Sequence, residues 1–462
     1  MRVRAERDAR AREEGIKLLP VEILRWIFTL TLGSPPPLLD DRPVCDIVHG
    51  PLRISHVNAH WRHTALATPK LWSTIYITSG TSINLLRFLF EHSKAYSLWI
   101  GFRCGSDSRS PKISPEVYSL LQIHAERVEA ISFAGDELET IEAITANMSA
   151  LKEIGLHSSL GLQRISDKVP FVFPTTPSSN ISNFRATFSV ILPPLFVGRN
   201  LCVLEITAIT LQYMPLKLMA SCPNLEVARF RIPRDIRLPS SAIYDNQVRA
   251  ARLTDLSLSF PDQQDWNVLR SVMTNLYAPQ LQTVTLQINS WPPTEDTRDW
   301  DVSAHGTFGL ASATRIVVVH PGSSDRAIML YTKMFHALAS FENVEHLELN
   351  RMRLGCLLDN RALCSPEHRQ IFPKLRTLLF RDGYLTAEDK RGNFFTNLDR
   401  WGEERFGTVV VEEPYHETLR GSTESFMESS ECSLVWRESS ERGWRIALGE
   451  DVQSCDQQLS GW

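Results

Sequence analysis

The sequence predicts an α/β chain, in which a small helical module at the N-terminus precedes an irregular, horseshoe-like solenoid of alternating helices and parallel strands. Apolar residues recur at helical spacing between Pro20 and Ala65. Further along, a six-residue pattern with apolar residues at its first, fourth and sixth places recurs nine times between Val128 and Phe380. Hydrophobic residues make up 43% of the chain and charged residues 22%, which is ordinary for a chain that buries a large core.

We expect four segments along the 462 residues. Residues 1–17 form a charged helix or extension, because acids precede bases by four places in three pairs. Residues 18–77 form the helical module, and residues 78–414 form the solenoid. Residues 415–462 are rich in serine and glutamate and have few long apolar runs, so this tail is expected to be poorly ordered.

The first helix of the module is expected to begin at Pro20 and to end at Gly33. Proline suits the first helical turn because its missing N–H has no intrahelical partner there. Glycine supplies a left-handed cap, and the prolines at 35–37 cannot continue the helix. A loop over residues 34–51 is expected to follow.

A second helix is expected up to the Thr68–Pro69 pair, which ends it. Its apolar stripe has offsets of three, seven and eleven residues and consists of Ile54, Val57, Trp61 and Ala65. After it, residues 69–77 turn into an extended run of β-branched and aromatic residues.

Three histidines could bind zinc if they lay on one face of this helix. His56, His60 and His63 have i, i+4, i+7 spacing, and that face lies roughly opposite the apolar stripe. No fourth ligand is near them in the sequence. We therefore expect a solvated polar face and no metal site.

Three motifs in this module resemble a known family. They are L-P-x-E-I-L at 19–24, V-x-x-x-W-R at 57–62 and A-x-x-T-P-x-L-W at 65–72. Together they resemble an F-box of the kind that heads many proteins of mushroom-forming fungi, with Asn58 where the family often has cysteine. The resemblance implies docking to the Skp-type adaptor of cullin-RING ubiquitin ligases. It implies adaptor contact, or the small core that presents it, for Leu19, Pro20, Ile23, Leu24, Ile27, Val57 and Trp61.

The repeated pattern predicts the architecture of the solenoid. Its successive starts are 23, 50, 24, 28, 28, 32, 31 and 31 residues apart, and the 50-residue gap leaves room for a skipped copy near Phe184–Phe188. This is the L-x-x-L-x-L core of a leucine-rich repeat of irregular length. Helices are expected between the strands, at 215–221, 266–276 and 327–339. Residues 385–411 are expected to close the array.

Stacked strands of this kind present ladders of outward side chains, which suit a binding surface. Charged residues occupy many outward places, and such residues are more often solvated surface than anchors. Within this set, the candidates for contact with a protein substrate are Arg229, Asp255, Arg315, His346 and Arg376.

The chemistry of the chain favours binding over catalysis. No G-x-S-x-G, H-E-x-x-H, Walker or G-x-G-x-x-G motif occurs, and Cys104 and Cys222 are single thiols without a C-x-x-C partner. The net charge of −4 gives no reason to expect nucleic acid, and no apolar stretch approaches the roughly 20 residues of a membrane span. We expect no cofactor, no metal and a cytoplasmic or nuclear location.

The resulting hypothesis is a non-catalytic substrate-recognition subunit of an SCF-type cullin-RING ubiquitin ligase. Its partners are the Skp-type adaptor, through it the cullin and RING subunits, and a protein substrate. Two alternatives stay open at this point. One is an F-box and repeat scaffold without ubiquitin transfer, and the other is a hydrolase with a scattered site.

Overall fold

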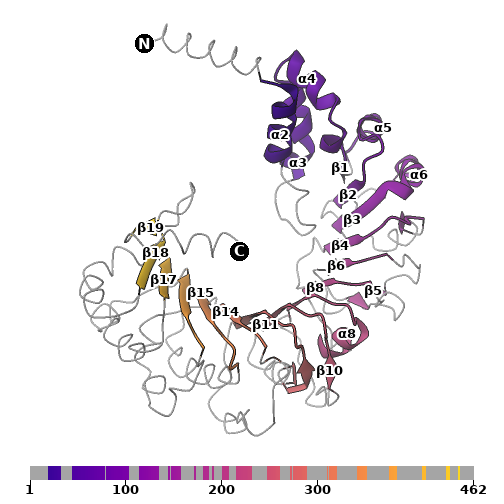
Figure 1. Ribbon diagram of the computed structural model, residues 1–462. Coiled ribbons are helices and arrows are strands. Elements are labelled where there is room, and N and C mark those ends of the chain that lie inside the picture. Colours follow the sequence, from indigo (N-terminus) through magenta and orange to yellow (C-terminus); the bar gives the residue numbers. More distant parts are fainter. Residues whose placement is uncertain are drawn as a thin grey trace. The chain divides into compact units, whose positions relative to one another are not determined.

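The computed structural model describes part of the chain (Figure 1). The described residues are 19–32, 44–78, 80–103, 114–134, 144–145, 147–157, 171–172, 180–186, 190–191, 200–207, 215–231, 247–260, 271–272, 274–288, 310, 312–319, 341–350, 374–381, 408–412, 433–437 and 446–447. The predicted extension at 1–17 lies outside them. By its internal contacts, the chain divides into two compact units, Met1–Ala208 (unit 1) and Ile209–Trp462 (unit 2).

Unit 1 begins with short helices that pack on one another: α2 (Val21–Leu32), α3 (Val44–Ser55), α4 (Ala59–Leu66) and the 3₁₀ helix η1 (Pro69–Trp72). Leu24 and Phe28 are buried on the inner side of α2, and the Phe28 ring lies 5.0 Å from the ring of Trp61. The buried Trp72 indole donates a hydrogen bond of 2.8 Å to the Ala65 carbonyl. These contacts tie the helices into one small core.

The predicted second helix is wrong in two respects. Helix α3 begins at Val44, so residues 44–51 are helical where a loop was expected, and Pro51 lies inside this helix. The expected single helix is also divided, because Asn58 caps α4: its side-chain oxygen accepts a 2.8 Å hydrogen bond from the Trp61 N–H. His56 lies in the turn between the two helices, so the three histidines do not share one helical face.

The rest of unit 1 is a parallel sheet with helices between its first strands. The strands are β1 (Thr74–Thr78), β2 (Leu98–Arg103), β3 (Val128–Ala134), β4 (Glu153–His157), β6 (Asn183–Ala186) and β8 (Val203–Thr207), in that order. Helix α5 (Ile83–His92) connects β1 to β2, and α6 (Pro115–Ile123), with the 3₁₀ helix η2 (Ala125–Arg127), connects β2 to β3. Both helices lie along the same side of these strands (Figure 1). A separate parallel pair consists of β5 (Phe171–Val172) and β7 (Val190–Ile191).

Unit 2 contains a second run of parallel strands. They are β9 (Val227–Arg231), β11 (Asp255–Phe260), β13 (Thr283–Ile288), β14 (Arg315–Val319), β15 (His346–Asn350), β16 (Thr377–Arg381), β17 (Thr408–Glu412) and β18 (Ser433–Arg437). Strand β19 (Ile446–Ala447) adds to β18 in antiparallel orientation. Helix α8 (Pro215–Ser221) precedes β9, and β10 (Val248–Arg249) pairs with β12 (Leu276–Tyr277).

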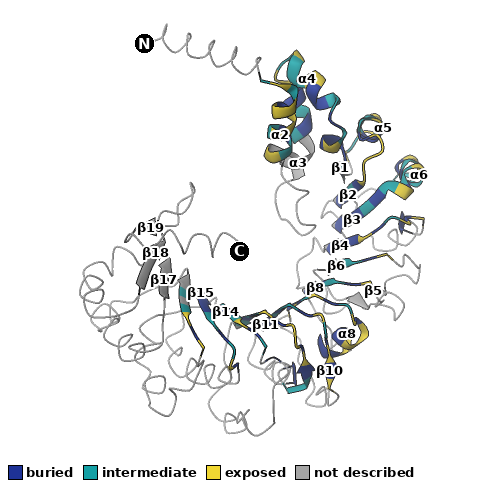
Figure 2. Cartoon of the chain, in the orientation of Figure 1, coloured by how far each residue is buried: buried dark blue, intermediate teal, exposed yellow. Residues whose placement is uncertain are grey.

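The strands follow the six-residue pattern with a constant offset. In the eight copies from Leu151 onward, the strand begins two residues after the first place of the pattern, as β11 begins at Asp255 after Leu253. The first, fourth and sixth places are buried wherever the side chain is described (Figure 2). Strand register aligns these places, so Leu256 pairs with Ala228 on one side and with Val284 on the other. The core of each unit's sheet is therefore a set of parallel apolar ladders.

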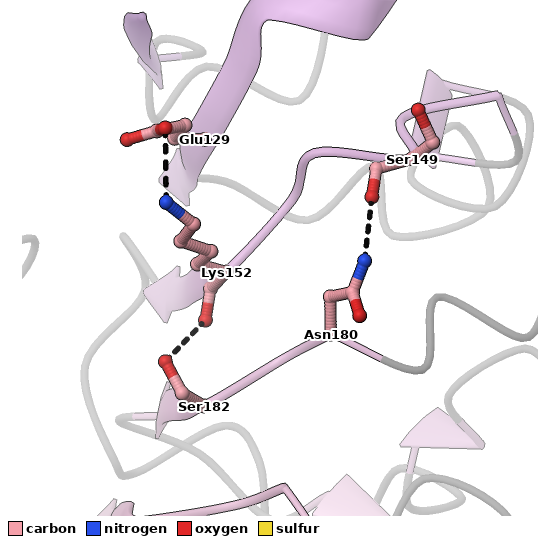
Figure 3. A network of polar contacts seen from close by, with 5 residues as sticks. All are labelled: Glu129, Ser149, Lys152, Asn180 and Ser182. Atoms are coloured by element: carbon pink, nitrogen blue, oxygen red, sulfur yellow. Dashed lines mark hydrogen bonds and ion pairs between the residues drawn. The ribbon is translucent and has the colours of Figure 1, made fainter.

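Successive copies are joined by the same backbone hydrogen bonds. The carbonyl at the second place accepts from two N–H groups of the next copy, as the Glu226 carbonyl does from Thr254 at 2.8 Å and Asp255 at 3.1 Å. The same double contact is made by the carbonyls of Lys152, Ser182, Thr254, Gln282, Thr314 and Glu345. Figure 3 shows this junction in unit 1, where the Ser182 hydroxyl also donates to the Lys152 carbonyl at 3.3 Å and the Lys152 ammonium contacts Glu129 at 3.0 Å.

The skipped copy lies slightly earlier than expected, over residues 181–186. Ile181, Phe184 and Ala186 occupy its buried places, and β6 forms its strand. The 50-residue gap between the starts at Leu151 and Leu201 therefore divides into 30 and 20 residues.

The structure confirms an α/β chain with parallel strands. The helix expected at 215–221 is present as α8. Within the helix expected at 266–276, residues 271–272 and 274–275 are helical, whereas Leu276 belongs to β12. The helix expected at 327–339 lies outside the described residues. Strands β18 and β19 fall within the range expected to be poorly ordered. Within the described part of the chain, every helix is too short or too polar to cross a membrane.

Candidate functional site

The outer side of α2 carries exposed apolar side chains. Ile23 is 44% exposed, Trp26 63% and Leu30 59%, and their i, i+3, i+7 spacing places them on one side of the helix. We call these three residues the α2 face. Val57, in the turn between α3 and α4, is 56% exposed. Exposed apolar residues of this size, gathered on one helix, are typical of a surface that another protein covers.

The residues predicted to serve adaptor docking fall into three groups. Pro20, Ile23 and Val57 are exposed, and Leu19, Ile27 and Trp61 are half-buried. Leu24 is fully buried beside Phe28 in the helical core, so it supports the surface from within. Trp26 and Leu30 were missed because they lie outside the family motif, although their helical spacing from Ile23 was a usable signal.

The residues predicted to contact a substrate all lie in unit 2. Arg376 occupies the second place of its copy, whereas Arg229, Asp255, Arg315 and His346 lie on the face of the sheet that carries the third, fifth and seventh places of the pattern. We call this the polar face. Arg229 on β9 pairs with Asp255 on β11 at 3.5 Å. Arg315 on β14 lies opposite His346 on β15. Arg376, just before β16, lies 4.0 Å from Glu345 and is mostly exposed. The structure therefore brings Arg229 within reach of Asp255 and sets Arg315 opposite His346. His346 directly follows Glu345, the acid that Arg376 faces.

A buried carboxylate lies at the centre of one of these groups. Glu348 is only 3% exposed, and its two oxygens contact the Arg315 guanidinium at 2.5 Å and the Asn350 amide at 3.1 Å. Burial lowers the pKa of the neighbouring His346, the Arg315 and Arg376 charges lower it further, and Glu345 opposes them. The His346 imidazole is consequently neutral at neutral pH.

Unit 1 has its own charged cluster, which the sequence-based candidates did not include as a site. Arg185 on β6 lies between two carboxylates, with its Nε 3.7 Å from Glu153 on β4 and 3.5 Å from Glu205 on β8. Burial raises the pKa of Glu153, although Arg185 and a hydrogen bond from Asn183 act in the opposite direction. Arg185 was missed because it lies in the skipped copy of the pattern.

Two observations on the described residues concern metal binding and thiol chemistry. Among them, no three His, Cys, Asp or Glu side chains lie close enough together to hold a metal ion. Cys222 is fully buried, and burial raises the pKa of its thiol to about 12, so it stays protonated at neutral pH. Cys104 lies outside the described residues.

No protein-family model matches this chain, and no curated protein matches it either.

Proposed function

We propose that this chain is the substrate-recognition subunit of an SCF-type cullin-RING ubiquitin ligase. The α2 face carries the proposal, because it lies on the helix that begins directly after Pro20 in the L-P-x-E-I-L motif. A partner that buried Ile23, Trp26 and Leu30 would gain about 2 kcal/mol for each side chain removed from water. The Skp-type adaptor is the occupant that the three F-box-like motifs favour.

The finer architecture of the body belongs to the same proposal. We infer that the parallel strands form an irregular leucine-rich-repeat solenoid following an F-box. Three observations support it: the two-residue offset of the strand in each copy of the pattern from Leu151 onward, the burial at the first, fourth and sixth places, and the carbonyl shared between successive copies. A repeat that cannot bury its apolar face alone must stack on its neighbours.

In this function the chain acts by proximity. The adaptor side is held through the helical module, and the substrate is held on the polar face of the sheet. Tethering raises the local concentration of the substrate's lysines near the ubiquitin-loaded enzyme, which other subunits supply. The chain forms and breaks no covalent bond.

Adaptor binding tests the proposal directly. We expect the purified full-length chain to bind a Skp-type adaptor, and we expect Ile23→Asp combined with Leu30→Asp to weaken binding by about a hundredfold, because two buried apolar contacts are replaced by charges. Ile123→Asp is the matched control, since Ile123 on α6 is 74% exposed and lies outside the module. Failure of the wild-type chain to bind the adaptor would overturn the proposal.

Ubiquitin transfer separates the ligase from a scaffold. In a reconstituted reaction with adaptor, cullin and RING subunits, proteins that co-purify with the chain should acquire ubiquitin, and the Ile23 and Leu30 double variant should abolish this. Adaptor binding without any ubiquitin transfer to these proteins would support the scaffold alternative.

A further inference from the structure

The polar face of unit 2 includes a group of hydroxyls that lack partners within the described part of the chain. Strands β11 and β13 set Ser257 opposite Thr285, Ser259 opposite Gln287 and Asp255 opposite Thr283. We name Ser257, Ser259, Thr283 and Thr285 the hydroxyl patch. None of these four side chains forms a hydrogen bond with another described residue.

Ser259 is the member of this patch whose hydroxyl gives the strongest evidence for a missing partner. It is only 7% exposed, and its hydroxyl oxygen is buried without a hydrogen-bond partner among the described residues. Leu256 and Leu258 point into the core, so alternation along β11 turns Ser259 to the polar face. A buried hydroxyl without a partner is costly, and in a native protein it calls for a partner that completes it.

Arginines flank the hydroxyl patch on both sides. On β9, Arg229 lies opposite Ser257 and Arg231 lies opposite Ser259. On β14, Arg315 lies opposite Thr283. Three strand spacings separate β9 from β14, about 14 Å in all. The small side chains of the hydroxyl patch therefore lie between the longer arginine side chains.

One arginine beside this patch forms no ion pair within the described part of the chain. Arg229 is paired with Asp255 and Arg315 with Glu348. Arg231 is exposed and forms no ion pair with a described residue. Arg231 therefore contributes a positive charge beside the buried hydroxyl of Ser259.

We propose that the hydroxyl patch binds an extended acidic segment of the protein substrate, with one aspartate or glutamate carboxylate held by Ser259 and Arg231. A carboxylate accepts hydrogen bonds both from a hydroxyl and from a guanidinium, and the charge-assisted bond is the stronger. One carboxylate also matches the single charge of Arg231, whereas a phosphate carries nearly two. This inference rests on the proposed function, and it adds the chemical class of the substrate.

Selection of peptides on the full-length chain tests the inference. Random linear peptides displayed on phage are selected on the immobilised protein, and one enriched peptide is then titrated by fluorescence anisotropy. We expect enrichment of aspartate or glutamate at one position. Arg231→Glu should weaken binding of the enriched peptide by about tenfold. Arg252→Glu should leave it unchanged, because Arg252 is also exposed but lies in the turn before β11.

Ser259→Ala separates a binding role from a structural one. The alanine removes a buried, unpaired hydroxyl, so thermal stability should be unchanged or higher, while peptide binding weakens by about threefold. No acidic enrichment, equal effects of the Arg231 and Arg252 variants, or undiminished binding by Ser259→Ala would each overturn the inference. Tighter binding of a phosphoserine peptide than of its aspartate counterpart would overturn the single-carboxylate assignment.

Adaptor binding measured on the same preparations keeps the two proposals distinguishable. Adaptor binding without acidic peptide selection would overturn this inference and leave the proposed function standing. Acidic selection without adaptor binding would overturn the proposed function and leave an acidic-segment receptor of another kind.

Discussion

The α2 face and the polar face of unit 2 expose opposite kinds of side chain. The first presents Ile23, Trp26 and Leu30, and the second presents arginines and carboxylates that already pair within the chain. Apolar contact is non-directional and scales with the area buried, so it suits one constant partner. Paired charges give specificity and on-rate more than affinity, so they suit discrimination among substrates.

Two tryptophans give the sharpest test of this contrast within the helical module. Trp72→Ala should lower the free energy of unfolding by about 4 kcal/mol, because Trp72 is fully buried and donates a hydrogen bond to Ala65. Trp26→Ala should leave stability nearly unchanged while weakening adaptor binding. Urea denaturation and adaptor titration of both variants measure the difference. A large loss of stability in Trp26→Ala would show that the α2 face is part of a core.

The polar face contains one buried pair and one solvated pair, which should differ strongly. Arg315→Met leaves the Glu348 carboxylate buried without its guanidinium, and we expect a loss of about 3 kcal/mol. Arg229→Met breaks a pair whose members are half-exposed, so a loss of about 0.5 kcal/mol is expected. Both are read from chemical denaturation at low salt. Equal losses would mean that burial of Glu348 does not set the energetics of the face.

The cap of α4 offers a smaller effect on the module side. Asn58→Ala removes the hydrogen bond to the Trp61 N–H and should lower stability by about 1 kcal/mol. Asn58→Asp retains an acceptor and serves as the control. Thermal unfolding followed by circular dichroism measures both, and an alanine variant as stable as the aspartate variant would contradict the capping role.

The smallest expected effect is a dependence on pH in unit 1. Burial raises the pKa of Glu153 above its ordinary value of 4.5, so the folded state binds a proton more tightly than the unfolded state does. Stability contributed by this group is therefore present below pH 4.5 and is lost as pH rises through the folded pKa. Glu153→Gln should flatten this part of the stability curve measured by denaturation at several pH values. An unchanged curve would remove Glu153 as its cause.

The sequence predicted the sheet far better than the helices. Buried residues such as Leu253, Leu256 and Leu258 could be predicted, because the spacing of apolar residues in the pattern matches the places that are buried in a strand stacked on its neighbours. The break between α3 and α4 was missed because the apolar stripe continues past Asn58, whose capping role is local and leaves no mark on periodicity. The spacing of apolar residues alone does not show that one side-chain hydrogen bond starts a new helix within a continuous apolar stripe.

The candidate site was predictable only in part. Arg229 and Asp255 could be listed as outward residues, but their pairing depends on the register of β9 and β11, which the sequence does not state. Ser259 gave no signal, since a serine on a strand becomes notable only when its hydroxyl is buried without a partner. Arg185 escaped because Ala186 makes its copy of the pattern hard to recognise.

The carbonyl shared between successive copies gives the array a direction. At seven junctions between described copies, one copy supplies the acceptor and the copy that follows supplies the donors. An under-satisfied carbonyl is tolerated in proteins more readily than an orphaned N–H. During synthesis, a newly emerged copy such as the one at Leu253 therefore meets an acceptor already in place at Glu226. Growth from the N-terminus adds N–H donors to an edge whose carbonyl acceptors are already in place. Removal of early copies would leave the N–H groups of later copies without these acceptors.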